Sequence, residues 1–171
     1  MKKNVIRIIF CLTIILCSIT AYAAPRETYP RDFRGIKWGS HFIDNPGFRE
    51  HSGSSYLDIL RGYTRQNDRP FVGDVPLKHP PLYVFYRNQF LQVLMDVESG
   101  IPAERVLKVL ESTFGKPDEP YPRNVWEWLP VSPNDVRVYL VYDDDNKRII
   151  MANRTLYEEY LAYSQTTQRD F

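Results

Sequence analysis

Cysteine is almost absent from this chain. Of the 171 residues only two are cysteines, Cys11 and Cys17, and both lie near the N-terminus. From residue 18 onward there is no thiol that could form a disulfide, a thiolate metal site or a cysteine nucleophile. A folded domain in this part of the chain must therefore be stabilised by its apolar core.

A surplus of charge of one sign is also lacking. The chain has 22 lysines and arginines against 21 aspartates and glutamates. Nucleic-acid-binding proteins carry a clustered excess of basic residues, so we expect no nucleic-acid partner. No stretch has the pattern of a cationic amphipathic helix, so we expect no membrane-surface helix.

Long apolar runs are confined to the N-terminus. Residues 8–19 are mostly apolar, follow a positively charged start and precede Ala21-Tyr22-Ala23, an A-x-A cleavage site. This is the pattern of a secretory signal peptide. We predict that residues 1–23 are removed and that the mature protein of a bacterium is periplasmic or secreted.

Two other fates are possible for such a segment. A retained membrane anchor needs about 20 apolar residues, and the run is shorter. A lipid anchor on Cys17 would want a small residue before the cysteine, whereas Leu16 is large. We therefore expect no stable membrane insertion after cleavage.

The remaining chain is predicted to consist of one domain between two short terminal segments. Residues 24–32 are polar and contain two prolines, which is typical of a flexible terminus. We predict a single α+β domain over residues 33–165 and a frayed C-terminus over residues 166–171.

Alternating and β-branched segments predict the strands. Residues 82–86 and 90–97 form the clearest hairpin. On the return strand every second residue from Leu91 to Val97 is apolar, which predicts one buried face. Further strands are predicted within residues 56–68 and at 125–129, 136–142 and 148–153.

Two segments have helical spacing. One begins near Pro102 and ends at Gly115. The other begins where Thr155 and Glu158 match a capping box. Together the elements predict an α+β fold: an antiparallel sheet of about five to six strands with helices on one face. Two β-β-β-α halves, with or without true duplication, are one arrangement of that fold.

Several of these sequence motifs resemble those of a known group of proteins. The opening F-x-G-I-x-W-G resembles the start of uncharacterised small exported bacterial proteins. The residues that carry it are Phe33, Gly35, Ile36, Trp38, Gly39, Tyr83, Phe85, Leu91, Phe114, Gly115, Pro117 and Trp126. More distantly, the pattern is similar to the β-lactamase-inhibitor-like and outer-membrane-assembly-lipoprotein folds. That similarity implies a protein that works by binding other proteins.

The stretch F-R-G-I-K-W-G-S, residues 33–40, is the most distinctive local motif. It has neither the G-x-G-x-x-G spacing nor the lysine–serine pair of a phosphate loop. We expect Gly35 and Gly39 to allow tight turns around a buried Trp38. Ligand contact by this stretch is the alternative.

Metal-binding patterns are missing. His41, His51 and His79 lie in different loops, without the short spacing of metal ligands. Residues 143–147 lack the glycine and final glutamate of a calcium loop. We predict no metal and no cofactor.

Aromatic residues are the unusual quantity, at 14% with 12 tyrosines. Tyrosine is enriched at interfaces because its large ring carries a polar tip. We place Tyr83, Phe85, Phe90 and Tyr139 on strand faces opposite the apparent core. They form either an exposed patch or a second core layer, covered by the N-terminal loop and the C-terminal helix.

We therefore expect a non-enzymatic exported binding module with no catalytic residues, whose partner is an unknown protein or envelope component. The expected binding residues are Trp38, Tyr83, Phe85, Phe90, Trp126, Trp128 and Tyr139. One alternative is a small envelope hydrolase that uses His41 or His51 with a nearby carboxylate, such as those around the E-H-S-G-S-S stretch. The other is a small-ligand-binding protein that holds its ligand between sheet and helix with Tyr121 and the two tryptophans at 126 and 128.

Overall fold

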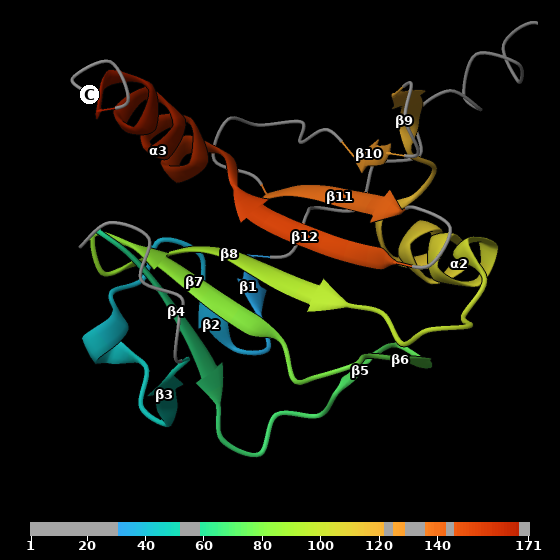
Figure 1. Ribbon diagram of the computed structural model, residues 1–171, viewed down its shortest axis with the longest axis horizontal. Coiled ribbons are helices and arrows are strands. Elements are labelled where there is room, and N and C mark those ends of the chain that lie inside the picture. The colour runs from blue at the N-terminus through green and yellow to red at the C-terminus, as the bar shows by residue number, and fades with distance from the viewer. Residues whose placement is uncertain (1–30, 52–58, 122–124, 129–135, 143–145, 168–171) are drawn as a thin grey trace, which may run out of the picture.

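The chain is built around one antiparallel sheet (Figure 1). The computed structural model describes residues 31–51, 59–121, 125–128, 136–142 and 146–167. Within them, eight strands pair in the order β3-β4-β7-β8-β12-β11-β10-β9. The strands are β3 (Phe48–Glu50), β4 (Leu60–Arg65), β7 (Leu82–Tyr86), β8 (Gln89–Asp96), β9 (Asp118–Tyr121), β10 (Val125–Trp128), β11 (Val136–Tyr142) and β12 (Lys147–Asn153).

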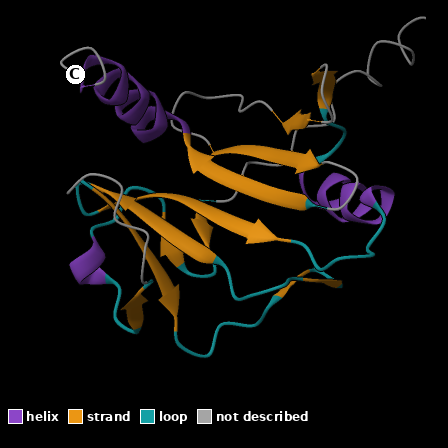
Figure 2. Cartoon of the chain, viewed as in Figure 1, coloured by secondary structure: helices purple, strands orange, loops and turns teal. Residues whose placement is uncertain are grey.

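Short hairpins and helices complete the fold (Figure 2). They are β1 (Asp32–Phe33) with β2 (Ile36–Lys37), β5 (Phe71–Val72) with β6 (Val75–Pro76), the 3-10 helix η2 (Phe42–Asp44), and the helices α2 (Ala103–Phe114) and α3 (Arg154–Thr167). The expected signal peptide lies outside the described residues. None of the described helices combines the length and apolarity that crossing a membrane requires.

The α+β class is confirmed, because both helices sit against an antiparallel sheet. The sheet has eight strands where five to six were expected. The two additional strands are its edges, β3 and β9. The sequence did not predict them because Pro46 and Gly47 precede β3 and Pro120 lies within β9, and both residue types are depleted in strands.

The two halves of the chain share one topology. β3-β4-β7-β8-α2 and β9-β10-β11-β12-α3 are each a four-stranded meander followed by a helix, and they meet where β8 pairs with β12. The repeating unit is therefore β-β-β-β-α, with one strand more than the expected β-β-β-α.

The sheet has two different faces, because successive side chains of a strand point to opposite sides. One face, here called the covered face, carries Tyr83, Phe85, Val93 and Met95 into the main apolar core. That core also contains Val138 and other residues of the second half. It lies beneath the N-terminal segment and α2, which contribute partly buried rings and the buried Val106 and Leu110.

The opposite side of the sheet is here called the open face. α3 packs on one end of it, where Tyr86, Leu91 and Leu156 form a separate small cluster. Tyr86 directly follows Phe85, and the two therefore point to opposite faces. The two helices thus lie on opposite faces of the sheet, and the expectation that both lie on one face is corrected.

The hairpin of β7 and β8 contains an irregularity that alternation alone does not reveal. Phe85 pairs with Phe90, but Val84 pairs with Gln92, so one extra residue is inserted in β8. This bulge places Leu91 in the α3 cluster and Phe90 in the main core. The strict alternation expected from Leu91 to Val97 therefore holds only from Val93.

The helix ends follow local chemistry. α2 is preceded by Pro102 and followed by Gly115, whose φ of +76° suits a residue without a side chain. At α3 the backbone N–H of Leu156 donates to Asn153 Oδ1 at 3.1 Å. The N-cap is therefore Asn153, and the capping box expected at Thr155 is wrong.

Candidate functional site

Most of the aromatic residues expected to bind a partner are inside the core. Tyr83, Phe85, Phe90 and Trp128 have at most 1% of their surface exposed. The N-terminal segment covers the first three: the Trp38 ring stacks on Phe90 with centroids 4.4 Å apart. The exposed patch is thus corrected, and so is the second core layer. These rings share the main core with Val93 and Met95, whereas the C-terminal helix packs on Tyr86 and Leu91 instead.

The other three expected residues divide between the faces. Trp38 is half-buried and packs on the main core. Trp126 is half-buried against the main core, next to the fully buried Trp128. Tyr139 is half-buried and lies on the open face, since its neighbours Val138 and Leu140 enter the core. Of the seven residues, Tyr139 alone therefore belongs to the face that the main core leaves uncovered.

The motif at residues 33–40 has a structural explanation. Arg34 and Gly35 form the two-residue turn between β1 and β2, with φ of +53° and +82°. The Arg34 guanidinium forms an ion pair with Asp68 at 2.9 Å and donates to the carbonyl of Arg69 at 2.8 Å and to that of Phe71. These contacts tie the N-terminal hairpin to the loop that follows β4.

This connection continues into the core. The Tyr83 hydroxyl donates to the second carboxylate oxygen of Asp68. Burial raises the pKa of Tyr83 well above its usual value, and the Asp68 carboxylate raises it further. The phenol therefore stays a hydrogen-bond donor, and the network holds the shape of this region.

The space between sheet and α2, where a small ligand was an alternative, is filled by side chains at Trp128. Its indole N–H donates to the Gly115 carbonyl at 2.7 Å, and its ring meets Phe114 edge-on at 6.5 Å. A buried donor that is already satisfied has nothing left to offer a ligand. The side chain of Tyr121 lies outside the described residues.

The histidines of the hydrolase alternative are at the surface. His41 precedes η2 without a side-chain bond to that helix, and both His41 and His51 are exposed. The serines that follow His51 lie outside the described residues. Among the described residues, no three histidines or carboxylates gather where they could hold a metal ion.

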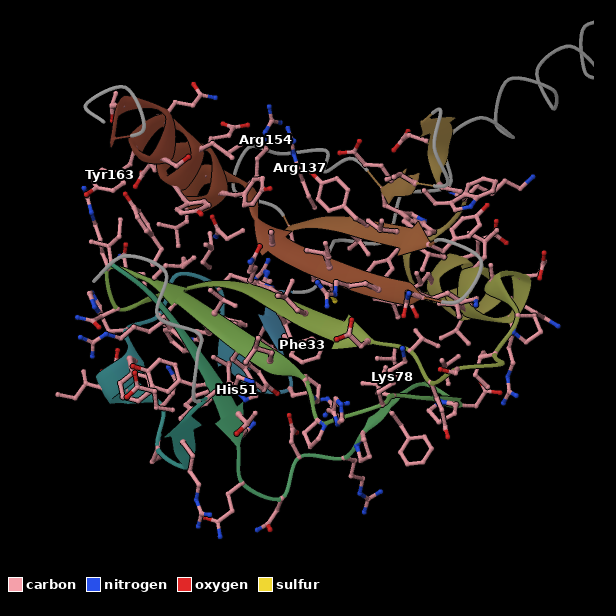
Figure 3. All side chains as sticks on the ribbon, in the orientation of Figure 1. Phe33, His51, Lys78, Arg137, Arg154 and Tyr163 are labelled. Carbon is pink, nitrogen blue, oxygen red and sulfur yellow. The ribbon has the colours of Figure 1, made fainter. Side chains whose placement is uncertain are left out.

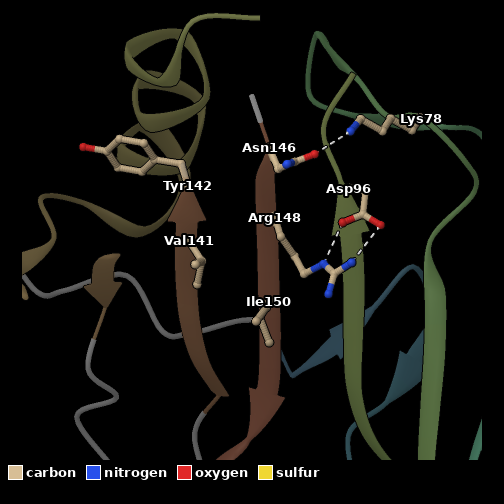
Figure 4. A pocket seen from close by; sticks show the side chains of 7 residues that line it. All are labelled: Lys78, Asp96, Val141, Tyr142, Asn146, Arg148 and Ile150. Carbon is tan, nitrogen blue, oxygen red and sulfur yellow. Dashed lines mark hydrogen bonds and ion pairs between the residues drawn. The ribbon is translucent and has the colours of Figure 1, made fainter. Parts of the chain in front are cut away.

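The open face carries a depression of about 430 Å³ (Figure 4). It lies near the start of β12, whereas α3 follows the end of that strand (Figure 1). Its lining comes from the loop before β7 and from the ends of β8, β11 and β12: Lys78, Asp96, Val141, Tyr142, Asn146, Arg148 and Ile150. Val141 is 37% exposed, which is unusual for a large apolar strand residue in this chain. The depression therefore combines apolar and charged groups.

Paired side chains fix the polar groups of the depression. Arg148 makes a bidentate pair with Asp96, with Nε–Oδ1 at 2.6 Å and Nη2–Oδ2 at 3.1 Å. The bond to Asp96 raises the pKa of Arg148. Lys78 donates to Asn146 Oδ1 at 3.1 Å. Such pairing orders both cations and leaves further N–H groups for an acceptor outside the protein.

A second polar cluster occupies the same face nearer α3. Arg137 and Arg154 lie close together (Figure 3) and both reach Glu158, at 3.4 and 2.9 Å. Arg137 also donates to the Tyr139 hydroxyl at 3.3 Å, while its buried Nε has no partner among the described residues. Burial and the neighbouring Glu127 raise the pKa of Tyr139, against the opposing effect of Arg137.

Sequence reasoning missed the depression because its residues come from four separate segments. The alternation of residues 136–142 did separate Tyr139 and Val141 from the core set. That signal alone could have indicated an open face, but the pairing of Arg148 with Asp96 depends on how β12 aligns with β8.

The chain matches no protein-family model, and comparisons with curated proteins and with solved structures find no match.

Proposed function

We propose that this protein is a non-enzymatic binding module, exported from the cell, that contacts a protein of the envelope through the open face of its sheet. The observation that carries the proposal is the depression at Asp96, Arg148 and Val141, where an exposed apolar group lies beside charged groups held in fixed pairs. Interfaces combine these features: apolar centres with polar groups arranged for directional contact.

The many aromatic residues still support contact through a face of the sheet, although it is not the face that most of them occupy. Most of the rings build the core beneath the covered face. Among the described residues, the part of the open face that α3 does not cover is accessible for contact. The resemblance to folds that bind other proteins agrees with this role. Of the seven residues first expected at the interface only Tyr139 is kept, and Val141, Arg148 and Ile150 replace the other six.

The test is site-specific photo-crosslinking in the full chain. A crosslinking residue replaces Val141 in one variant and Thr113, on the exposed side of α2, in another. We expect a discrete adduct from position 141 that is absent from position 113. The adduct should be lost when Arg148→Glu is added, because like charges then face each other at Asp96.

One result of this experiment would contradict the proposal. If positions 141 and 113 give the same adducts, or none, the open face is not an interface. Circular dichroism of each variant before crosslinking ensures that a lost adduct reports contact and not unfolding.

A further inference from the structure

A second surface combines arginines with an exposed aromatic ring, at the corner where the β1–β2 hairpin meets the loop after β4. This arginine corner consists of Arg34, Arg65, Arg69 and Phe71. Three of its residues, with Asn67, Asp68 and Gly73, line a depression of about 420 Å³. The open face contributes none of its lining.

The charges of the corner are only partly compensated. Arg34 is paired with Asp68, whose side chain is 9% exposed. Arg65 donates to the Arg34 carbonyl at 2.9 Å but has no carboxylate partner among the described residues. Arg69 is exposed, and within the described part of the chain its side chain has no partner. The corner therefore carries a local excess of positive charge on a chain that is almost neutral.

The aromatic ring is held in place beside these cations. Phe71 is 47% exposed although its backbone is fixed on three sides. Its N–H donates to the Arg69 carbonyl at 2.9 Å, its carbonyl accepts from Arg34, and it pairs with Pro76 in the β5–β6 hairpin. Because the backbone is rigid and the apolar ring faces solvent, the ring stays available to contact a membrane or another molecule.

We propose that the arginine corner binds the surface of an anionic phospholipid membrane, with the arginines on the phosphate groups and Phe71 in the interfacial layer. Guanidinium groups bind phosphate, and each cation near an anionic membrane adds to the attraction. A small phosphate ion would use the arginines but has no use for the exposed ring. Aromatic side chains, in contrast, are favoured at the membrane–water boundary.

The contact is peripheral. The described helices include none that could cross a membrane, and one ring with a few cations gives reversible attachment. The proposal is independent of the function proposed for the open face.

The experiment is co-sedimentation of residues 24–171, the chain without its expected signal peptide, with vesicles. One set contains phosphatidylcholine alone, and the other contains about one-third phosphatidylglycerol, which adds the anionic charge that attracts cations. We expect sedimentation with the anionic set alone. Binding should weaken strongly when sodium chloride rises from about 0.1 M to about 0.5 M, because salt screens exposed charges.

The variants isolate the two components. Arg69→Gln removes one cation and should weaken binding to anionic vesicles about fivefold. Phe71→Ser removes the ring and should weaken binding without changing its dependence on salt. Arg148→Gln removes the same charge from the open face and should bind vesicles like the unmodified protein, so that failure of this proposal is separate from failure of the other.

A second measurement reports contact with lipid directly, so that a folding defect in the other variants cannot be mistaken for lost binding. Phe71→Trp should show extra fluorescence quenching by brominated anionic lipids relative to the unmodified protein, whose three tryptophans supply the baseline. Equal binding to neutral vesicles, no binding to either set, or unchanged binding by both Arg69→Gln and Phe71→Ser would overturn the proposal. So would full displacement by inorganic phosphate at constant ionic strength, which would indicate a site for small anions.

Discussion

At the scale of single residues, two arginines occupy backbone conformations that usually favour glycine or asparagine. Arg34 and Arg87 each stand first in a two-residue turn, with φ of +53° and +48°. The left-handed region costs most residues roughly 1–2 kcal/mol. Arg34 compensates with its ion pair and two carbonyl contacts, whereas Arg87 lies against the rings of Tyr86 and Tyr163.

This difference predicts that the same substitution has unequal effects at the two positions. Arg34→Asn should lower the free energy of unfolding by about 2 kcal/mol, because the largely buried carboxylate of Asp68 loses its cation. Arg87→Asn should change it by less than about 0.5 kcal/mol, since the relieved backbone offsets a cation–π contact of about 0.5–1 kcal/mol. Urea unfolding of both variants measures the difference. Equal losses would contradict the assigned role of Arg34.

From the raised pKa of Tyr83 we predict how the free energy of unfolding changes at alkaline pH. Its pKa is raised in the folded protein above the unfolded value near 10, so the folded state retains its proton longer. The stabilisation is complete below about pH 10 and is lost as the pH rises further, by up to about 1.4 kcal/mol per pH unit. Tyr83→Phe should flatten this decline in urea unfolding between pH 9 and 11, with Tyr139 supplying the remainder. An unchanged slope would show that Tyr83 does not titrate as proposed.

At the scale of elements, α3 depends on its cap because its buried contact is small. Leu156, at the third position of the helix, both receives the Asn153 cap and packs on Tyr86 and Leu91. Asn153→Ala should cost about 1 kcal/mol in urea unfolding, whereas Asn153→Asp keeps the acceptor and should cost less than about 0.5 kcal/mol. Equal effects of the two substitutions would argue against the cap.

The elements also show what sequence patterns could predict. Alternation and turn chemistry predicted β4, β7, β8, β10, β11 and β12, and helical spacing predicted α2 and α3. The short edges β3 and β9 were missed because pairing with a neighbour holds them, not their own propensity. The bulge at Leu91 was missed because the alternation of apolar and polar residues in the sequence does not show where an extra residue is inserted. That single inserted residue lets Phe90 join Val93 in the main core while Leu91 packs against α3.

At the scale of the molecule, the two topological halves share one core. Residues of β4, β7 and β8 and residues of β10, β11 and β12 belong to the same buried cluster, and β8 pairs with β12 over five residue pairs. Neither half can lose its packing without exposing apolar surface of the other. The halves should therefore unfold together, although each has a complete strand–helix pattern of its own.

Substitution at one site in the second half tests this coupling. Leu140 is fully buried in β11, and Leu140→Ala should lower the free energy of unfolding by about 2–5 kcal/mol. Its neighbour Val141 lies on the open face, and Val141→Ala should change stability by less than about 0.5 kcal/mol. In both variants, circular dichroism and tryptophan fluorescence should report one coincident urea transition. Separate transitions in Leu140→Ala would mean that the first half keeps its fold alone, and the shared core would then not be the unit of stability.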